Sequence, residues 1–234
     1  MIFVMKPTEL YRYFLRGHLR SGTALPRFAW EDWKCRDYYM WDPPEGFLEQ
    51  VSDAAAVGLM LASGAWIAAR MNRVDPDPMP DYALRAGWAF MLEPESCFYY
   101  EPNDNDWRGP VRAPMSIMAV IAMDALYCRD ADPEVRIRTH WMANLARYVL
   151  EDDAETFDAW FNWAADRLAR VHPRSEMPTL GLFDVPVRFE PVVGRDVFVP
   201  ETDYDPATAR SSLYNWLMQG DRDNPFIDFS ELRP

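Results

Sequence analysis

The chain contains few of the residues from which metal centres are built. It has three cysteines, at positions 35, 97 and 128, and three histidines, at positions 18, 140 and 172. Zinc sites need such ligands at short, characteristic spacings. No His-Glu-x-x-His or Cys-x-x-Cys motif occurs, and the histidines lie more than 30 residues apart. The sequence therefore predicts no transition-metal site.

A calcium site is also not expected. Asp104, Asn105 and Asp106 resemble the start of a calcium-binding loop. Arg108 and Met115, however, stand at its fifth and twelfth positions, where calcium needs oxygen ligands.

Lysine is nearly absent, because it occurs only at positions 6 and 34. No glycine-rich motif that could cradle a phosphate group is present either. The Gly-x-Ser-x-Gly turn, which presents the serine nucleophile of many hydrolases, is missing as well. We therefore expect no cofactor and a protein that is not an enzyme.

The cysteine count and the apolar segments favour a cytoplasmic protein. An odd, sparse set of cysteines is typical of reduced thiols in a cytosol. The apolar stretch at residues 1–5 is too short for a signal peptide. The segment from Ala54 to Ala69 carries no charge for 16 residues, whereas a membrane span needs about 20. It is predicted to be a central buried helix.

Acidic residues outnumber basic ones by 37 to 24, which gives a net charge of −13 and a pI near 4.6. Residues 1–40 carry a net charge of +3, so the remaining residues carry −16. Binding to nucleic acids and anionic membranes depends on basic side chains, and both partners are disfavoured. A basic protein partner fits this charge, and so does simple solubility.

The hydrophobic pattern predicts a mainly α-helical single domain of about six to seven helices over residues 1–234. Residues 1–172 form the expected helical core, with helices over residues 8–20, 45–73, 81–92, 115–128, from about 132 to 149, and over 152–171. Residues 173–234 are expected to add a β-hairpin at 185–199, a helix from about 205 to 220 and an acidic tail, all packed on the core.

Residues 93–107 form the first candidate site. This long loop has five acidic and no basic side chains, and it also contains large aromatic rings. Interfaces that capture a basic surface combine aromatic anchors with carboxylates in this way. The alternative is an ordinary solvated loop. The predicted partner-binding residues are Tyr99, Tyr100, Glu101, Asp104, Asp106 and Trp107.

Two further groups of carboxylates stand out. Glu151, Asp152, Asp153 and Glu155 form a secondary acidic patch, which would also suit the first turn of a helix. Asp124 lies in an otherwise apolar helix and is predicted to be a buried structural carboxylate, paired with an arginine or the backbone. The alternative for Asp124 is a catalytic role.

The acidic–aromatic loop from Glu93 to Trp107 and the acidic tail from Glu201 to Glu231 give the chain a family resemblance. It resembles the immunity proteins of bacterial polymorphic-toxin and contact-delivered effector systems. The resemblance implies a non-enzymatic protein that binds a cognate basic toxin and occludes its active site or the path of its substrate. The basic residues in 1–40 depart from a uniformly acidic DNA mimic.

Two other functions remain open at this point. The chain could be a helical enzyme or a small-ligand-binding protein that uses Asp124 in an aromatic pocket. It could also be a structural adaptor of a larger assembly.

Overall fold

The protein is mainly α-helical, as the hydrophobic pattern predicts. The computed structural model describes residues 24–26, 28–29, 42–102, 107–127, 134–174, 191–220 and 222–234. The helix expected over residues 8–20 lies outside these ranges. The α-helices are α3 (Asp53–Asn72), α4 (Met79–Leu92), α5 (Gly109–Tyr127), α6 (Glu134–Leu150), α7 (Ala154–Val171) and α8 (Ala209–Gln219), and the 3-10 helices are η2 (Pro94–Ser96), η3 (Glu151–Asp153), η4 (Arg195–Phe198) and η5 (Pro206–Thr208).

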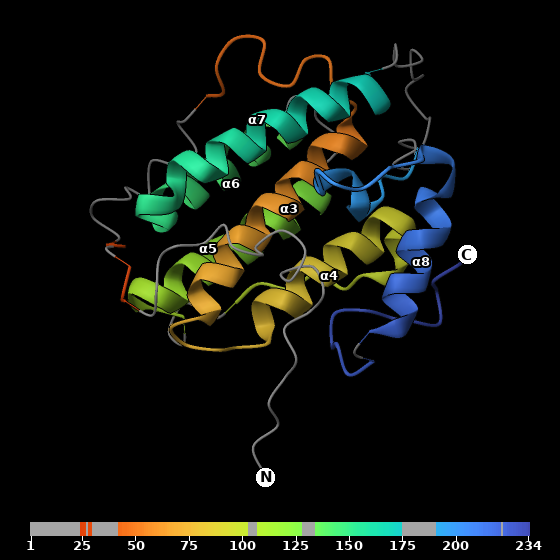
Figure 1. Cartoon of the computed structure of the whole chain (residues 1–234). Helices are drawn as coiled ribbons and strands as arrows, with labels where there is room; N and C mark the ends of the chain where they lie inside the picture. Colours follow the sequence, from red (N-terminus) through yellow and green to blue (C-terminus); the bar gives the residue numbers. More distant parts are fainter. Residues whose placement is uncertain are drawn as a thin grey trace, which may run out of the picture.

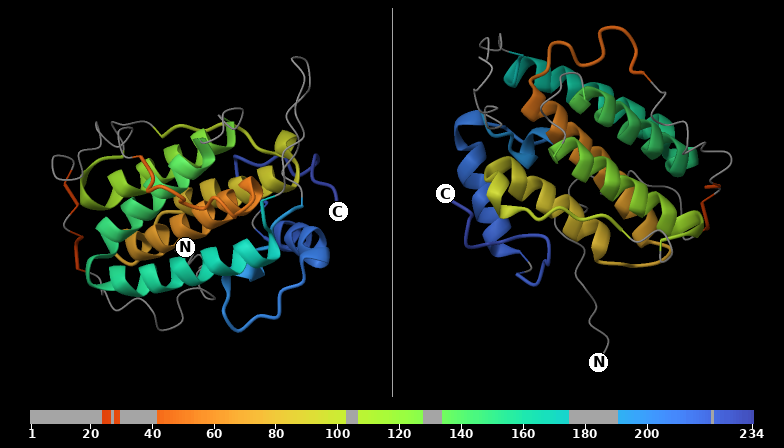
Figure 2. Two further views of the ribbon diagram at one scale, coloured as in Figure 1. Left: turned by 90° about the horizontal axis from the view of Figure 1, so that it is seen from above. Right: turned by 180° about the vertical axis from the view of Figure 1, so that it is seen from behind.

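Helix α3 runs through the middle of the bundle, as Figures 1 and 2 show. Every residue from Ala54 to Met71 is buried, and α3 contacts α4, α5, α6, α7 and η4. By length and hydropathy, α3 and α5 could each cross a membrane, but 94% and 72% of their apolar windows are buried inside the protein. Such burial is typical of the core helices of a bundle.

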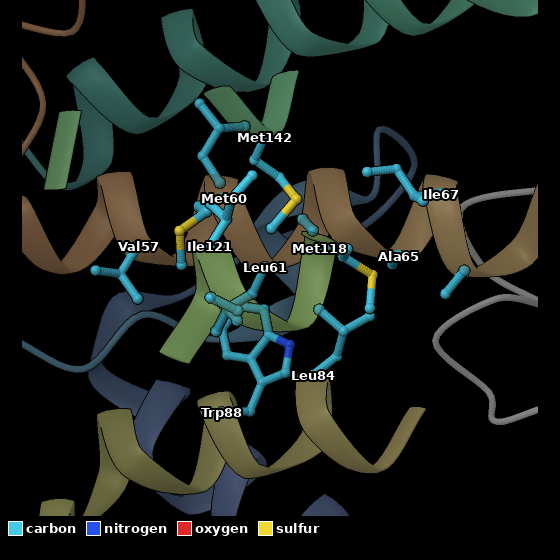
Figure 3. Packing of buried hydrophobic residues seen from close by; sticks show 14 of the residues in the cluster. Val57, Met60, Leu61, Ala65, Ile67, Leu84, Trp88, Met118, Ile121 and Met142 are labelled. Atoms are coloured by element: carbon cyan, nitrogen blue, oxygen red, sulfur yellow. The ribbon is translucent and has the colours of Figure 1, made fainter. Parts of the chain in front are cut away.

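Two glycines let α4 approach α3 closely. A Cβ atom on Gly87 would lie 2.5 Å from Leu61, and one on Gly64 would lie 2.8 Å from Leu84. In Figure 3, Leu84 and Trp88 point from α4 toward α3, and Met118 of α5 lies beside them. Interiors are close-packed, so little space remains for an added methyl group at either glycine.

Helix α3 starts later than its hydrophobic pattern suggests. Ser52 caps the helix, because its side chain accepts a hydrogen bond from the backbone N–H of Ala55. Residues 45–50 form turns instead of helix, with positive φ angles of 77° at Gly46 and 54° at Leu48. The expected start near residue 45 is therefore wrong, since left-handed backbone does not fit an α-helix.

Helix α5 starts at Gly109, so Pro114 lies inside the helix and does not open it. Trp107 and Val111 are buried at this end of the helix. Their burial keeps the first turn on the core, although Pro114 lacks the N–H of one helical hydrogen bond.

The second half of the expected hairpin is wrong. Residues 195–198 form the 3-10 helix η4, and residues 185–190 lie outside the described part of the chain. Val192, Val193, Val197 and Phe198 are all buried, in adjacent pairs that cannot share one face of a strand. The segment curls onto the core, where the indole N–H of Trp160 donates to the carbonyl of Phe198 at 3.1 Å.

Gly58 of α3 faces this curled segment. A Cβ atom at Gly58 would lie 3.2 Å from the ring of Phe198 and 3.3 Å from Val193. We expect Gly58→Leu to lower the free energy of unfolding by roughly 1–3 kcal/mol through overpacking. Denaturant unfolding measures this loss, and Gly58→Ala should cause a smaller one. An unchanged Gly58→Leu midpoint would contradict this packing.

Candidate partner-binding surface

The loop that follows α4 is fixed to the C-terminal segment of the chain. The N–H of Phe98 donates to the carbonyl of Phe226 at 2.9 Å, and the N–H of Asp228 donates to the carbonyl of Ser96 at 2.7 Å. Cys97 and Ile227 face each other in this antiparallel bridge. In Figure 2 (right), the yellow-green chain after α4 passes close to the dark-blue C-terminal segment.

Three large aromatic side chains near this bridge are exposed. Phe98 is 52% exposed, Tyr99 50% and Tyr127 40%. The rings of Tyr99 and Tyr127 pack edge to face, with their centroids 5.3 Å apart. The Tyr127 hydroxyl donates to the carbonyl of Cys97 at 2.6 Å, which fixes the end of α5 to the loop. We call Phe98, Tyr99 and Tyr127 the aromatic patch.

The residues predicted from the loop fall into different environments. Tyr99 and Glu101 are exposed, and Tyr100 is partly buried because it stacks on Phe226 at a centroid distance of 4.2 Å. Asp104 and Asp106 lie outside the described residues. The loop therefore presents Tyr99 and Glu101 to the solvent.

Trp107 is predicted from the sequence as a partner-binding residue, but the structure buries it. Its side chain is only 9% exposed and lies under Arg112, whose guanidinium carbon is 5.3 Å from the ring centroid. An anchor must enter a pocket of the partner. Trp107 is already packed inside its own protein.

Phe98 and Tyr127 belong to this surface but were not predicted as candidates. The sequence gives no signal for Tyr127, since it ends an apolar helix and its hydrogen-bond partner Cys97 is 30 residues away. Phe98 lies in the same acidic–aromatic loop as the predicted Tyr99, and this position could have identified it.

Cys97 and Tyr127 are unsuited to chemistry near neutral pH. Burial raises the pKa of the Cys97 thiol to about 12, although its hydrogen bond with Tyr127 acts in the opposite direction. Burial and the neighbouring Cys97 raise the pKa of the Tyr127 hydroxyl to about 12. Both groups remain protonated, so Cys97 is a structural thiol.

The four residues of the secondary acidic patch differ in how far they are buried. Asp152 and Glu155 are exposed, whereas Asp153 is fully buried and Glu151 is partly buried. The expected set of four surface carboxylates is therefore wrong for Asp153. Helix α7 begins after Asp153, which stands at its N-cap without a side-chain cap bond.

Asp124 lies beside an arginine but is less buried than predicted. Its carboxylate is 3.7 Å from the guanidinium of Arg138, and the two side chains are 22% and 11% exposed. Arg138 also lies over the ring of Trp141, 4.6 Å from its centroid. The pair links α5 to α6.

His172, at the end of α7, holds the segment that follows η4. Its Nε2 lies 2.7 Å from the hydroxyl of Tyr204, and that hydroxyl accepts the N–H of Gly194 at 3.0 Å. A hydroxyl can donate one hydrogen bond and accept two, so Tyr204 can hydrogen-bond with Nε2 of His172 while it accepts the N–H of Gly194. Nδ1 of His172 is buried and has no hydrogen-bond partner.

Burial lowers the pKa of His172 below its usual 6.5. As pH falls below about 6.5, the unfolded chain takes up a proton that the folded chain resists, so stability must fall. We expect the free energy of unfolding to decrease between about pH 6.5 and the lowered pKa. Urea titrations across this range measure the decrease.

His172→Gln should flatten this pH dependence, because an amide can accept the Tyr204 proton without titrating. His140→Gln serves as the companion variant, since burial, aided by Arg147, also lowers the pKa of His140. A pH slope that His172→Gln leaves unchanged would contradict the role of His172.

Within the ranges that the structure describes, no three His, Cys, Asp or Glu side chains come together as a metal-binding group. No protein-family model, curated protein or solved structure matches the chain. The surface around the aromatic patch is therefore interpreted from its own chemistry.

Proposed function

We propose that this protein is a non-enzymatic, cytoplasmic immunity protein that binds a cognate basic toxin and blocks its active site or the path of its substrate. The observation that carries the proposal is the aromatic patch, in which the exposed rings of Tyr99 and Tyr127 pack edge to face, with exposed Phe98 and Glu101 on either side of Tyr99 in the chain. Contiguous exposed rings on a soluble protein often mark an interaction site.

The charge of the chain supports a basic partner. The net charge of −13 creates a long-range attraction that speeds the encounter with a cationic protein. The rings would then supply the short-range contacts, because aromatic side chains dominate the binding energy of many interfaces. In this proposal the net charge speeds association with the toxin, and the aromatic patch slows dissociation.

The test uses the product of the neighbouring gene, with binding kinetics and the survival of cells that produce it as readouts. We expect Tyr99→Ala to cost about 2 kcal/mol or more of binding energy, mainly through faster dissociation. Glu101→Gln should mainly slow association, because charges at the rim of an interface act on encounter.

Leu25→Ala is the control, because Leu25 is 66% exposed and belongs to a distant stretch of the chain. It should bind and protect like the parent. If Tyr99→Ala also binds and protects like the parent, the aromatic patch is not the interface. If the parent recovers no basic protein and protects no cell, the immunity function itself is wrong.

A further inference from the structure

We propose that residues 222–231 form the second half of the partner-binding surface and that this composite face receives an arginine- or lysine-rich segment of the partner. This inference rests on the proposed function and deepens it. It adds Phe226 and Asp228 as contact residues and states the chemistry of the occupant.

The antiparallel bridge places the two segments side by side. Cys97 and Ile227 oppose each other and are 6% and 5% exposed, so they point into the core. The N–H of Phe98 donates to the carbonyl of Phe226, which makes these two residues neighbours across the bridge. Phe98 is 52% exposed, and Phe226 is partly exposed and stacks on Tyr100.

Asp228 adds a carboxylate to this surface. Its N–H donates to the carbonyl of Ser96, and its residue is partly exposed. Its carboxylate accepts hydrogen bonds from the backbone N–H of Ser230 at 3.0 Å and from the Ser230 hydroxyl at 2.6 Å. These bonds hold the pKa of Asp228 below its usual range, so the charge persists in mild acid.

The C-terminal segment is anchored well enough to present these groups. Asn224 is buried, donates to the carbonyl of Tyr82 at 3.0 Å and accepts the N–H of Phe226 at 3.0 Å. Further along, Arg210 of α8 donates to the carbonyl of Pro234 at 3.4 Å and pairs with the buried carboxylate of Glu93. A pre-ordered surface loses little conformational entropy on binding.

Charge complementarity identifies the occupant. Exposed carboxylates at Glu95, Glu101 and Glu231 belong to the same two segments as the rings. A cation is attracted both to carboxylates and to the face of an aromatic ring. The chain shows this preference itself, because Arg222 lies 4.8 Å from the ring centroid of Phe229 in the same segment. An arginine or lysine side chain of the partner satisfies both kinds of group.

The test titrates the full-length protein with an octa-arginine peptide and follows backbone amide resonances by NMR. We expect the largest shifts in residues 98–101 and 226–231. Asp228→Asn retains an acceptor for Ser230 and should weaken peptide binding by about two- to fivefold, the usual worth of one exposed charge. Asp166→Asn removes the same charge from an exposed site on α7 and should have no comparable effect.

Each result decides one question. Equal effects of Asp228→Asn and Asp166→Asn, or shifts spread evenly over the acidic surface, would overturn the inference. If the peptide maps to the composite face but no toxin is neutralised, the surface stands and the proposed function fails. If Tyr99→Ala abolishes toxin binding and Asp228→Asn leaves it unchanged, the proposed function stands and the role of the C-terminal segment fails.

Discussion

Replacing Arg136 by alanine should lower the free energy of unfolding by about 3–5 kcal/mol, because it leaves a carboxylate and two carbonyls near the core without their partner. Arg136 of α6 is 4% exposed. Its guanidinium donates to the Asp53 carboxylate at 2.6 Å, to the carbonyl of Val51 at 2.7 Å and to that of Leu48 at 3.2 Å. One side chain thus fixes the start of the central helix α3.

Chemical denaturation of Arg136→Ala measures this loss, and Arg233→Ala is the matched control. Arg233 pairs with Glu231 at 3.8 Å, but its side chain is 67% exposed. Exposed ion pairs contribute about 0–1 kcal/mol, so the control should unfold like the parent. Equal stability of the two variants would mean that Arg136 does not hold α3 in place.

Arg85→Ala should have the second-largest effect, a loss of roughly 2–4 kcal/mol, because charged donors to buried carbonyls are costly to remove. Arg85 of α4 is 5% exposed and donates to the carbonyls of Trp216 and Leu217 at 3.0 and 2.8 Å. It also lies 4.7 Å from the ring centroid of Trp216. These contacts fix the end of α8 on α4.

Hydrogen exchange distinguishes this role from a general loss of stability. In Arg85→Ala, the amides of α8 should exchange faster than those of α3, since only α8 loses its anchor. Gly220→Ala should reproduce the effect, because its Cβ atom would lie 1.3 Å from the Arg85 guanidinium. Uniform acceleration in both helices, or none, would contradict this anchoring.

The Arg85→Ala variant should also change how stability depends on pH, because the charge of Arg85 acts on the carboxyl group of Asp81. Burial raises the pKa of Asp81 to about 8, and the charge of Arg85 partly offsets this rise. Removing Arg85 therefore raises the pKa of Asp81 further. Because the folded chain then holds this proton to a higher pH, the fall in stability with rising pH should continue to higher pH in Arg85→Ala than in the parent.

The helices of the core could be predicted from the sequence because their burial leaves a continuous signal. The uncharged run from Ala54 to Ala69 identifies α3 as the central helix. The start of α3 was missed because it depends on Ser52 and on left-handed turns at Gly46 and Leu48. Alternation over residues 185–199 indicated a hairpin, but the core buries adjacent side chains at residues 192–193 and 197–198.

The candidate surface could be predicted only in part. Acids and rings in one loop indicated where to look, and Tyr99 and Glu101 are exposed there. Burial of Trp107 under Arg112, and the pairing of the loop with residues 226–228, both depend on tertiary contacts. No pattern within the loop shows that a segment more than 100 residues away pairs with it.

The association rate of the parent protein with the product of the adjacent gene, measured across a salt series, tests the central claim most directly. Salt shortens the screening distance from about 10 Å at 0.1 M to about 3 Å at 1 M. An acidic protein that captures a basic toxin should associate much more slowly as salt rises, while dissociation changes little. An association rate that is independent of salt, or a toxin that does not bind, would contradict the proposed function.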